Sequence, residues 1–288
     1  MALNYISLIQ FCRFTRYTNM SFTKNQITGL ALIGLIIFAG ISCEKLVESP
    51  QDLSLSYYPL KLGGYKIYQV DSVVYDEYNC LVDTVNYQLK EIYTDTIYDG
   101  EGALSYRIER LKSVDTGATW NLQSVWFEKY ADYQIQRVQD NQRFILFTFP
   151  AKMNRKWDGL VYIRKDTLIS LRGGSIDMFK DWDDFEMMEI DEPYADYTNL
   201  ITYDSTILII QADKINNIER RYSIERYAKN IGLIYKEQLI LDTQCRLDQF
   251  GNKTCSDVGD LSQCLFKTWE EKAEKGFIVK QVLIEHNY

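Results

Sequence analysis

The sequence predicts a mainly β protein, built as an antiparallel sheet, a half-barrel or a sandwich, with one short C-terminal helix. Apolar and polar residues alternate in many short blocks, which is the pattern of strands that bury one face. The 288 residues include 22 tyrosines but only 4 prolines and 15 glycines, a composition that suits long strands with amphipathic aromatic faces. So many strands at such spacing favour antiparallel pairing.

The predicted strands follow these blocks in chain order. They are residues 65–75, 85–93, 104–112, 124–129, 133–138, 144–149, 160–163, 206–211, 218–226, 233–241 and 277–285. Residues 175–189 are ambiguous, because apolar residues recur there every third position while the acidic residues between them are poor strand formers. An insertion loop is one interpretation of this segment.

One helix is well signalled, near the C-terminus. Thr268 can cap its start, Glu271 completes a capping box three residues later, and Gly276 can end it. The sequence therefore predicts a short helix between residues 268 and 276.

The N-terminal region contains an apolar run, residues 27–43, that ends in small residues and a cysteine. The run is interrupted by glycine and is shorter than the roughly 20 apolar residues of a spanning helix. Lys24 precedes it, as the positive charge of an export signal does. The run resembles the signal of a bacterial lipoprotein, in which the cysteine is acylated and becomes the new N-terminus. An uncleaved anchor helix is the alternative.

This resemblance implies that Cys43 carries the lipid, palmitate included, and that residues 1–42 are a removed signal peptide. Met20 would give a short polar region directly before the apolar run, which favours it as the start and leaves residues 1–19 untranslated. Residues 43–56 then form a lipidated tether and residues 57–288 the β-rich envelope domain. We expect the lipid bilayer as a partner and residence in the bacterial envelope, at the outer membrane.

The charge of the chain limits its partners. The formal net charge is −8, and removal of residues 1–42 takes away Arg13, Arg16 and Lys24 but no acidic residue. A strongly acidic protein is a poor partner for nucleic acid and for anionic lipid headgroups. We predict no nucleic-acid partner and no cofactor.

Four further cysteines follow Cys43, namely Cys80, Cys245, Cys255 and Cys264. In an oxidising compartment they are best interpreted as two disulfides. Residues 248–253 resemble a turn, so a bridge from Cys245 to Cys255 across a hairpin is plausible, although three pairings are open. Zinc binding is the rival interpretation, but no CxxC pair occurs and the one histidine is His286. We therefore predict no metal site.

Two motifs carry a family resemblance. Residues 57–68, YYPLKLGGYKIY, resemble the opening of mature lipoproteins of the Bacteroidota, and residues 227–237, YAKNIGLIYKE, are similar to a later element of the same proteins. The resemblance implies a β-rich envelope domain and no catalytic residues. Residues 149–153 also echo residues 58–62, which suggests a division into two layers near residue 150. Chance similarity of two turns is the alternative.

The residue inventory excludes most catalytic chemistry. Without a histidine before position 286, Ser-His-Asp, Cys-His and HExxH sites are absent, and no glycine-rich phosphate loop occurs. Glycoside hydrolysis stays open, because it needs only two carboxylates at the right separation. We predict that the protein is not an enzyme, with a glycoside hydrolase as the alternative.

Two residue groups have a functional and a structural interpretation. The acidic cluster lacks the spacing of a calcium loop and is better interpreted as a solvated loop; it comprises Asp177, Asp181, Asp183, Asp184, Glu186, Glu189, Asp191 and Glu192. The tryptophans could stack on sugars, but core packing is the more frequent role; they are Trp120, Trp126, Trp157, Trp182 and Trp269.

Five hydroxyl residues fit the Asp-Ser/Thr-aliphatic-or-Thr sequon of Bacteroidota O-glycosylation: Ser72, Thr84, Thr96, Thr167 and Ser205. The alternative is that each Asp marks a turn leading into a strand. Together these observations predict a membrane-anchored, non-catalytic binding or assembly module for an apolar ligand, a glycan or an envelope protein. A glycan-binding or carboxylate-based glycan-hydrolysing surface protein is the alternative. A large apolar concavity would favour an apolar ligand.

Overall fold

The computed structural model describes residues 54–172, 174–196, 200–247, 250–251, 264 and 266–288. Asp52–Tyr288 form one compact unit. Cys43, Cys255 and the segment expected to form the signal and most of the tether lie outside the described residues. None of the helices in the described part is long and apolar enough to cross a membrane.

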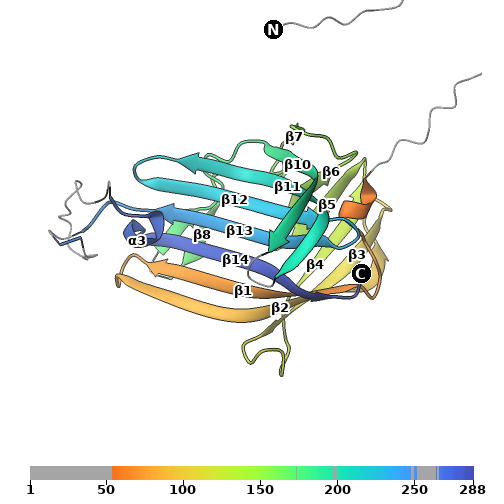
Figure 1. Ribbon diagram of the computed structural model, residues 1–288, viewed down its shortest axis with the longest axis horizontal. Coiled ribbons are helices and arrows are strands. Elements are labelled where there is room, and N and C mark those ends of the chain that lie inside the picture. The colour runs from red at the N-terminus through yellow and green to blue at the C-terminus, as the bar shows by residue number, and fades with distance from the viewer. Residues whose placement is uncertain (1–53, 173, 197–199, 248–249, 252–263, 265) are drawn as a thin grey trace, which may run out of the picture. The chain divides into compact units, whose positions relative to one another are not determined.

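Twelve strands of the described residues form one antiparallel sheet, so the predicted class is confirmed (Figure 1). Their order across the sheet is β6-β5-β4-β3-β2-β1-β14-β13-β12-β11-β10-β7. The strands of the first half are β1 (Tyr65–Asp76), β2 (Leu81–Tyr98), β3 (Leu104–Ser113), β4 (Asn121–Ala131), β5 (Gln134–Gln139) and β6 (Gln142–Thr148). Those of the second half are β7 (Lys156–Trp157), β10 (Phe185–Asp196), β11 (Ile201–Ile215), β12 (Glu219–Ala228), β13 (Gly232–Asp242) and β14 (Lys275–His286).

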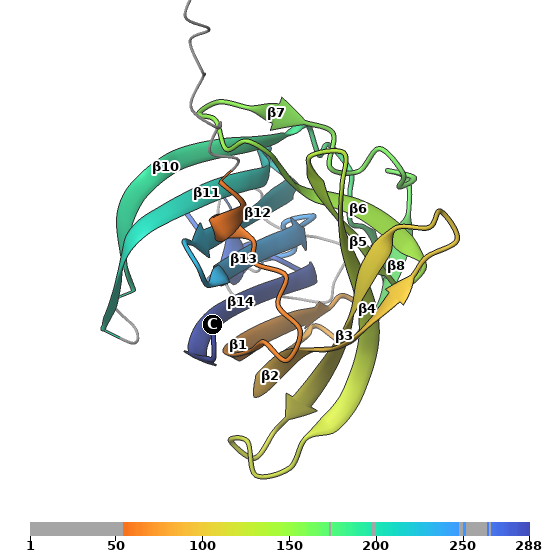
Figure 2. The same ribbon diagram turned by 90° about the vertical axis from the view of Figure 1, so that its right-hand side faces the viewer.

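The sheet curls until its two edges nearly meet, forming an almost closed barrel (Figure 2). At this seam the Ile145 amide of β6 donates to the Gly159 carbonyl at 3.0 Å. The Trp157 indole nitrogen of β7 donates to the Ile145 carbonyl at 2.9 Å. Residues 149–155, near the predicted division, carry the chain from one edge of this single sheet to the other.

Both ends of the barrel are covered. At one end lies the 3-10 helix η1 (Leu55–Tyr57), which brings Tyr57 and Tyr58 into the core and lies across the opening in Figure 2. At the other end lies the hairpin of β8 (Leu168–Leu171) and β9 (Gly174–Asp177), where Arg172 forms an ion pair with Asp83 of β2. Each end of the barrel therefore carries a segment that lies outside the twelve-stranded sheet.

The two motifs that resemble envelope lipoproteins lie side by side at the η1 end. The Tyr68 hydroxyl donates to the Leu233 carbonyl at 3.2 Å, and the Asn230 amide donates to the Ser56 carbonyl at 2.6 Å. Gly232 adopts a φ of 90°, which a glycine takes without strain, in the tight turn between β12 and β13. Ser56, expected in the tether, is thus bonded to the domain.

Some predicted elements are wrong. Residues 160–163 are not a strand but consecutive turns, in which the Leu160 amide donates to Asp158 Oδ1 and Leu160 and Ile163 are buried. Leu160 and Ile163 belong to the core without being paired in a sheet, whereas Val161 and Tyr162 are exposed. The ambiguous segment 175–189 contains β9, a turn closed by a 3.2 Å bond from the Trp182 amide to the Phe179 carbonyl, and the start of β10.

The predicted helix is α3 (Trp269–Lys272), with the Thr268–Glu271 capping box in place. Its end was predicted wrongly, because the C-cap is Ala273 and Gly276 lies inside β14. Gly276 has a φ of 117°, and a Cβ there would collide with the Ile240 carbonyl of β13. Close backbone approach, not helix termination, requires this glycine.

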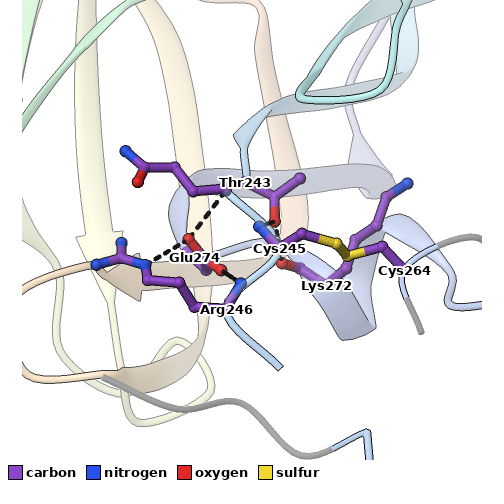
Figure 3. Close-up of a disulfide and its surroundings, with 7 residues drawn as sticks. Thr243, Cys245, Arg246, Cys264, Lys272 and Glu274 are labelled. Carbon is purple, nitrogen blue, oxygen red and sulfur yellow. Dashed lines mark hydrogen bonds and ion pairs between the residues drawn. A yellow bond between two sulfur atoms is a disulfide. The ribbon is translucent and has the colours of Figure 1, made fainter. Parts of the chain in front are cut away.

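A disulfide joins Cys245 to Cys264 beside this helix (Figure 3). Their Cα atoms are 6.0 Å apart, and the Cys245 amide donates to Thr243 Oγ1 at 2.9 Å. Cys245 is therefore paired with Cys264 rather than with Cys255, and Cys80 is also disulfide-bonded. Arg246 and Glu274 fix the same region with a 3.0 Å ion pair.

Candidate binding cavity

A cavity of about 380 Å³ lies inside the barrel. Small-molecule sites in proteins have volumes of roughly 300–1,000 Å³. The cavity is lined by residues from most strands of the sheet and by the segment from β8 to the start of β10. Its lining is divided into an apolar and a polar part.

The apolar part is mainly aromatic. Phe144 of β6 packs on Phe179 with ring centroids 6.0 Å apart, and Phe179 packs edge-on against Trp182 at 5.3 Å. Phe185, at the start of β10, continues the cluster at 6.1 Å from Trp182. Leu146 of β6 lines the same wall. This surface can bury an apolar chain or ring.

The polar part contains two cross-strand ion pairs. Arg110 of β3 lies opposite Glu91 of β2, with 2.9 Å between Arg110 Nε and Glu91 Oε1. Lys236 of β13 lies opposite Glu225 of β12, with 2.8 Å between Lys236 Nζ and Glu225 Oε1. Opposite charges directly across a strand pair stabilise the sheet, so each pair also supports the wall on which it lies.

A third pair, Glu128 of β4 and Arg137 of β5, is surrounded by tyrosines. Arg137 Nη2 lies 2.6 Å from Glu128 Oε1, while Tyr58 and Tyr93 each donate a 2.7 Å hydrogen bond to the same carboxylate. Burial and the nearby Glu128 charge raise the pKa of Tyr58 and Tyr93 well above its ordinary value, even though Arg137 opposes this at Tyr58. Both phenols therefore stay protonated and serve as donors.

Trp126 of β4 carries two guanidinium groups on its ring. The centroid of that ring lies 3.6 Å from Arg110 Cζ and 4.8 Å from Arg137 Cζ. Cation–π contacts of this kind hold an Arg in one position. Trp126 thus links the Glu91 pair with the Glu128 pair along one wall of the cavity.

Two buried glutamates of the cavity, Glu91 and Glu225, have lowered pKa values. Burial raises the pKa of Glu91, but the charges of Arg110, Arg137 and Lys66 outweigh it and hold the pKa below its ordinary value. Burial also raises the pKa of Glu225, but the positive charges of Lys236 and Arg137 lower it by more, so the pKa of Glu225 lies below its ordinary value. A general acid for glycoside hydrolysis needs the opposite, a carboxyl whose pKa is raised.

The predicted site residues are dispersed. Three of the tryptophans, Trp126, Trp157 and Trp182, are buried, so they do not form an exposed sugar-stacking face. The predicted solvated acidic loop is only partly correct, because Asp177 lies in β9 and residues 186–192 lie in β10. Within the described residues, no group of three or more His, Cys, Asp or Glu side chains could hold a metal ion. His286 is exposed at the end of β14.

The glycosylation candidates differ in position. Ser72, Thr84, Thr96 and Ser205 lie inside β1, β2, β2 and β11, so their Asp residues do not mark turns, whereas Thr167 lies in the turn before β8. Thr84 is exposed. Ser205 Oγ lies 2.8 Å from Asp191 Oδ1 and 2.5 Å from the Tyr57 hydroxyl oxygen.

Sequence reasoning missed the charged and amide residues of the cavity. Glu91, Glu128, Arg137 and Glu225 lie within predicted strands, where alternation alone assigns polar residues to the solvent face. The spacing along the strand could have identified Glu91. Leu89, Glu91 and Tyr93 follow one another at every second position, so an inward-facing Leu89 and Tyr93 place the Glu91 side chain on the inner face as well.

Comparison with known proteins adds no relative: no protein-family model, no curated protein and no solved structure matches this chain significantly.

Proposed function

We propose that this protein is a membrane-anchored, non-catalytic lipoprotein of the bacterial envelope that binds an amphipathic small molecule inside its barrel. The cavity of about 380 Å³, lined by an aromatic wall and by charged and amide groups, is the observation that carries the proposal. Ligand sites typically combine a mainly apolar surface with a few placed polar groups. The aromatic wall suits the apolar part of the ligand and the polar wall its head.

The anchor follows from the resemblance of residues 27–43 to a lipoprotein signal, with acylated Cys43 holding the protein on the bilayer at the outer membrane. Lipid anchoring would keep a carrier or binding protein close to a membrane source of amphipathic molecules. The resemblance to envelope lipoproteins of the Bacteroidota supports the same location.

The alternative is a glycan-hydrolysing protein that uses Glu91 and Glu225, both of which line the cavity. Each carboxylate has a basic partner within 3 Å, at 2.9 Å for Glu91 and 2.8 Å for Glu225, and each has a lowered pKa. Hydrolysis would require one of them to be protonated near neutral pH. This arrangement favours binding over catalysis.

The proposal is tested with the purified protein and N-phenyl-1-naphthylamine, an uncharged apolar dye whose fluorescence rises in an apolar site. We expect saturable binding to the wild type. The variant Val279→Trp, which fills the cavity from the inner face of β14, should weaken binding by about tenfold or more.

The matched control is Leu104→Trp, which adds a large side chain at the exposed first residue of β3, away from the cavity. It should bind the dye like the wild type. Absence of saturable binding, or equal binding by Val279→Trp and the wild type, would refute a ligand site in this cavity.

A further inference from the structure

The charges that line the cavity are balanced. The basic residues Arg110, Arg137 and Lys236 and the acidic residues Glu91, Asp140 and Glu225 all belong to the lining. Each of the three basic groups already has an acidic partner at 2.6–2.9 Å. An anionic headgroup would therefore compete with a carboxylate for each basic side chain of the lining. A cationic headgroup would likewise compete with a basic side chain for the carboxylates of these pairs.

A row of glutamines supplies uncharged hydrogen-bonding groups beside these pairs. Gln211 of β11, Gln238 of β13 and Gln281 of β14 line the cavity and are 4 %, 8 % and 5 % exposed. Ser223 of β12 connects two of them, since its hydroxyl donates to Gln211 Oε1 at 2.7 Å and accepts from Gln238 Nε2 at 3.1 Å.

Part of this row lacks a partner. Within the described residues, the buried Gln281 side chain makes no hydrogen bond, and the Ser223 bonds leave Gln211 Nε2 and Gln238 Oε1 available. These three glutamines line the cavity, where an amide group without a protein partner can bond to a ligand. Donors and acceptors together, presented by one row of amides, match a group that also offers both.

We propose that the polar part of the cavity recognises an uncharged, hydroxyl-rich headgroup, such as a sugar, carried on an apolar chain. This inference rests on the proposed binding function and names the class of ligand. Hydroxyl groups donate to Gln238 Oε1, accept from Gln211 Nε2 and do both with Gln281, while the chain packs against Phe144, Phe179 and Trp182.

The test compares three probes with the same ten-carbon chain: decyl β-D-maltoside, decanoate and decyltrimethylammonium. Each is titrated below its micelle concentration against protein carrying bound N-phenyl-1-naphthylamine at pH 7.5. We expect the maltoside to displace the dye at about tenfold lower concentration than either ion. Displacement by decanoate or by the ammonium probe at an equal or lower concentration overturns the inference.

Substitutions of the cavity glutamines test where the headgroup binds. Gln281→Leu and Gln238→Leu should weaken the maltoside by about fivefold or more, when the displacement by maltoside is referred to each variant's own dye affinity. Gln69→Leu is the matched control, since Gln69 lies on the outer face of the neighbouring strand β1. Unchanged maltoside affinity in both cavity variants overturns the inference, whereas failure of dye binding itself refutes the proposed function.

Discussion

The Tyr58 hydroxyl donates a 2.7 Å hydrogen bond to the Glu128 carboxylate, which lies 70 positions later in the chain. Tyr58 follows η1, so this bond ties the segment that covers one end of the barrel to β4. The same carboxylate balances Arg137, and both residues are almost fully buried. The N-terminal cover is therefore held by the interior charge network as well as by apolar packing.

This network predicts large effects on stability. Glu128→Gln should lower the free energy of unfolding by about 3–5 kcal/mol, because it leaves the buried Arg137 without its anion. Tyr58→Phe should lower it by about 1.5–3 kcal/mol, the contribution of a hydrogen bond to a charged group. Urea unfolding measures both. Tyr98→Phe, at an exposed position, is the control, and a wild-type midpoint for Glu128→Gln would contradict the prediction.

The pH dependence of stability should depend on Glu225. Its pKa is lowered in the folded state, so it contributes stability above its unfolded pKa, and this stability is lost as the pH falls through the folded pKa. Stability of the wild type should decline below about pH 5, where unfolded glutamate begins to bind protons. Glu225→Gln should start from a lower stability at pH 7 and decline less between pH 5 and pH 3. Parallel curves for the two proteins would show that Glu225 does not contribute to this loss.

The disulfide pairing can be tested chemically. Cys245 and Cys264 are separated by 19 positions, and a bridge across a loop of that size stabilises by about 3 kcal/mol. The double variant Cys245→Ser, Cys264→Ser should be less stable by that amount. Peptide mapping of the unreduced wild type should recover the Cys245–Cys264 peptide, and a Cys245–Cys255 peptide would contradict the structure.

Glycosylation should be selective among the five sequons. We expect occupancy at Thr84, which is exposed, and none at Ser205, whose hydroxyl lies between Asp191 and Tyr57. Mass spectrometry of the protein isolated from a Bacteroidota host measures occupancy at each position. Thr84→Ala is expected to remove the modified peptide, and a modified Ser205 with an unmodified Thr84 would oppose this ranking.

Lipidation remains a prediction from the sequence. Cys43→Ser should leave an unprocessed precursor that does not incorporate a tagged fatty acid, because no other cysteine follows an apolar export segment. Cys80→Ser is the control and should be labelled like the wild type. Undiminished label on the Cys43→Ser variant would exclude Cys43 as the site of attachment.

Alternation was sufficient to predict the class of fold and most strands, since blocks such as residues 104–112 begin with apolar side chains at every second position, at Leu104, Tyr106 and Ile108. It failed for β10, where Glu186, Glu189 and Asp191 weaken the strand pattern although tertiary pairing with β11 imposes it. It also failed for residues 160–163, because a run of apolar residues in consecutive turns has the same sequence pattern as a short strand. The cavity was not predictable, because the partners of Glu91, Glu128 and Glu225 come from neighbouring strands whose register only the folded sheet defines.

The seam between β6 and β7 has a mechanical consequence. Strands β1–β6 and β10–β14 are joined by longer ladders, whereas β7 pairs with β10 through two residue pairs. Among the described residues, β6 is linked to the β7 segment by the Ile145–Gly159 bond and the Trp157 indole bond. Because β7 has only two residues, the wall can widen there without breaking a ladder of strand pairing. The barrel can therefore change its width at this one flank, while the rest of the wall is held by the longer strand ladders.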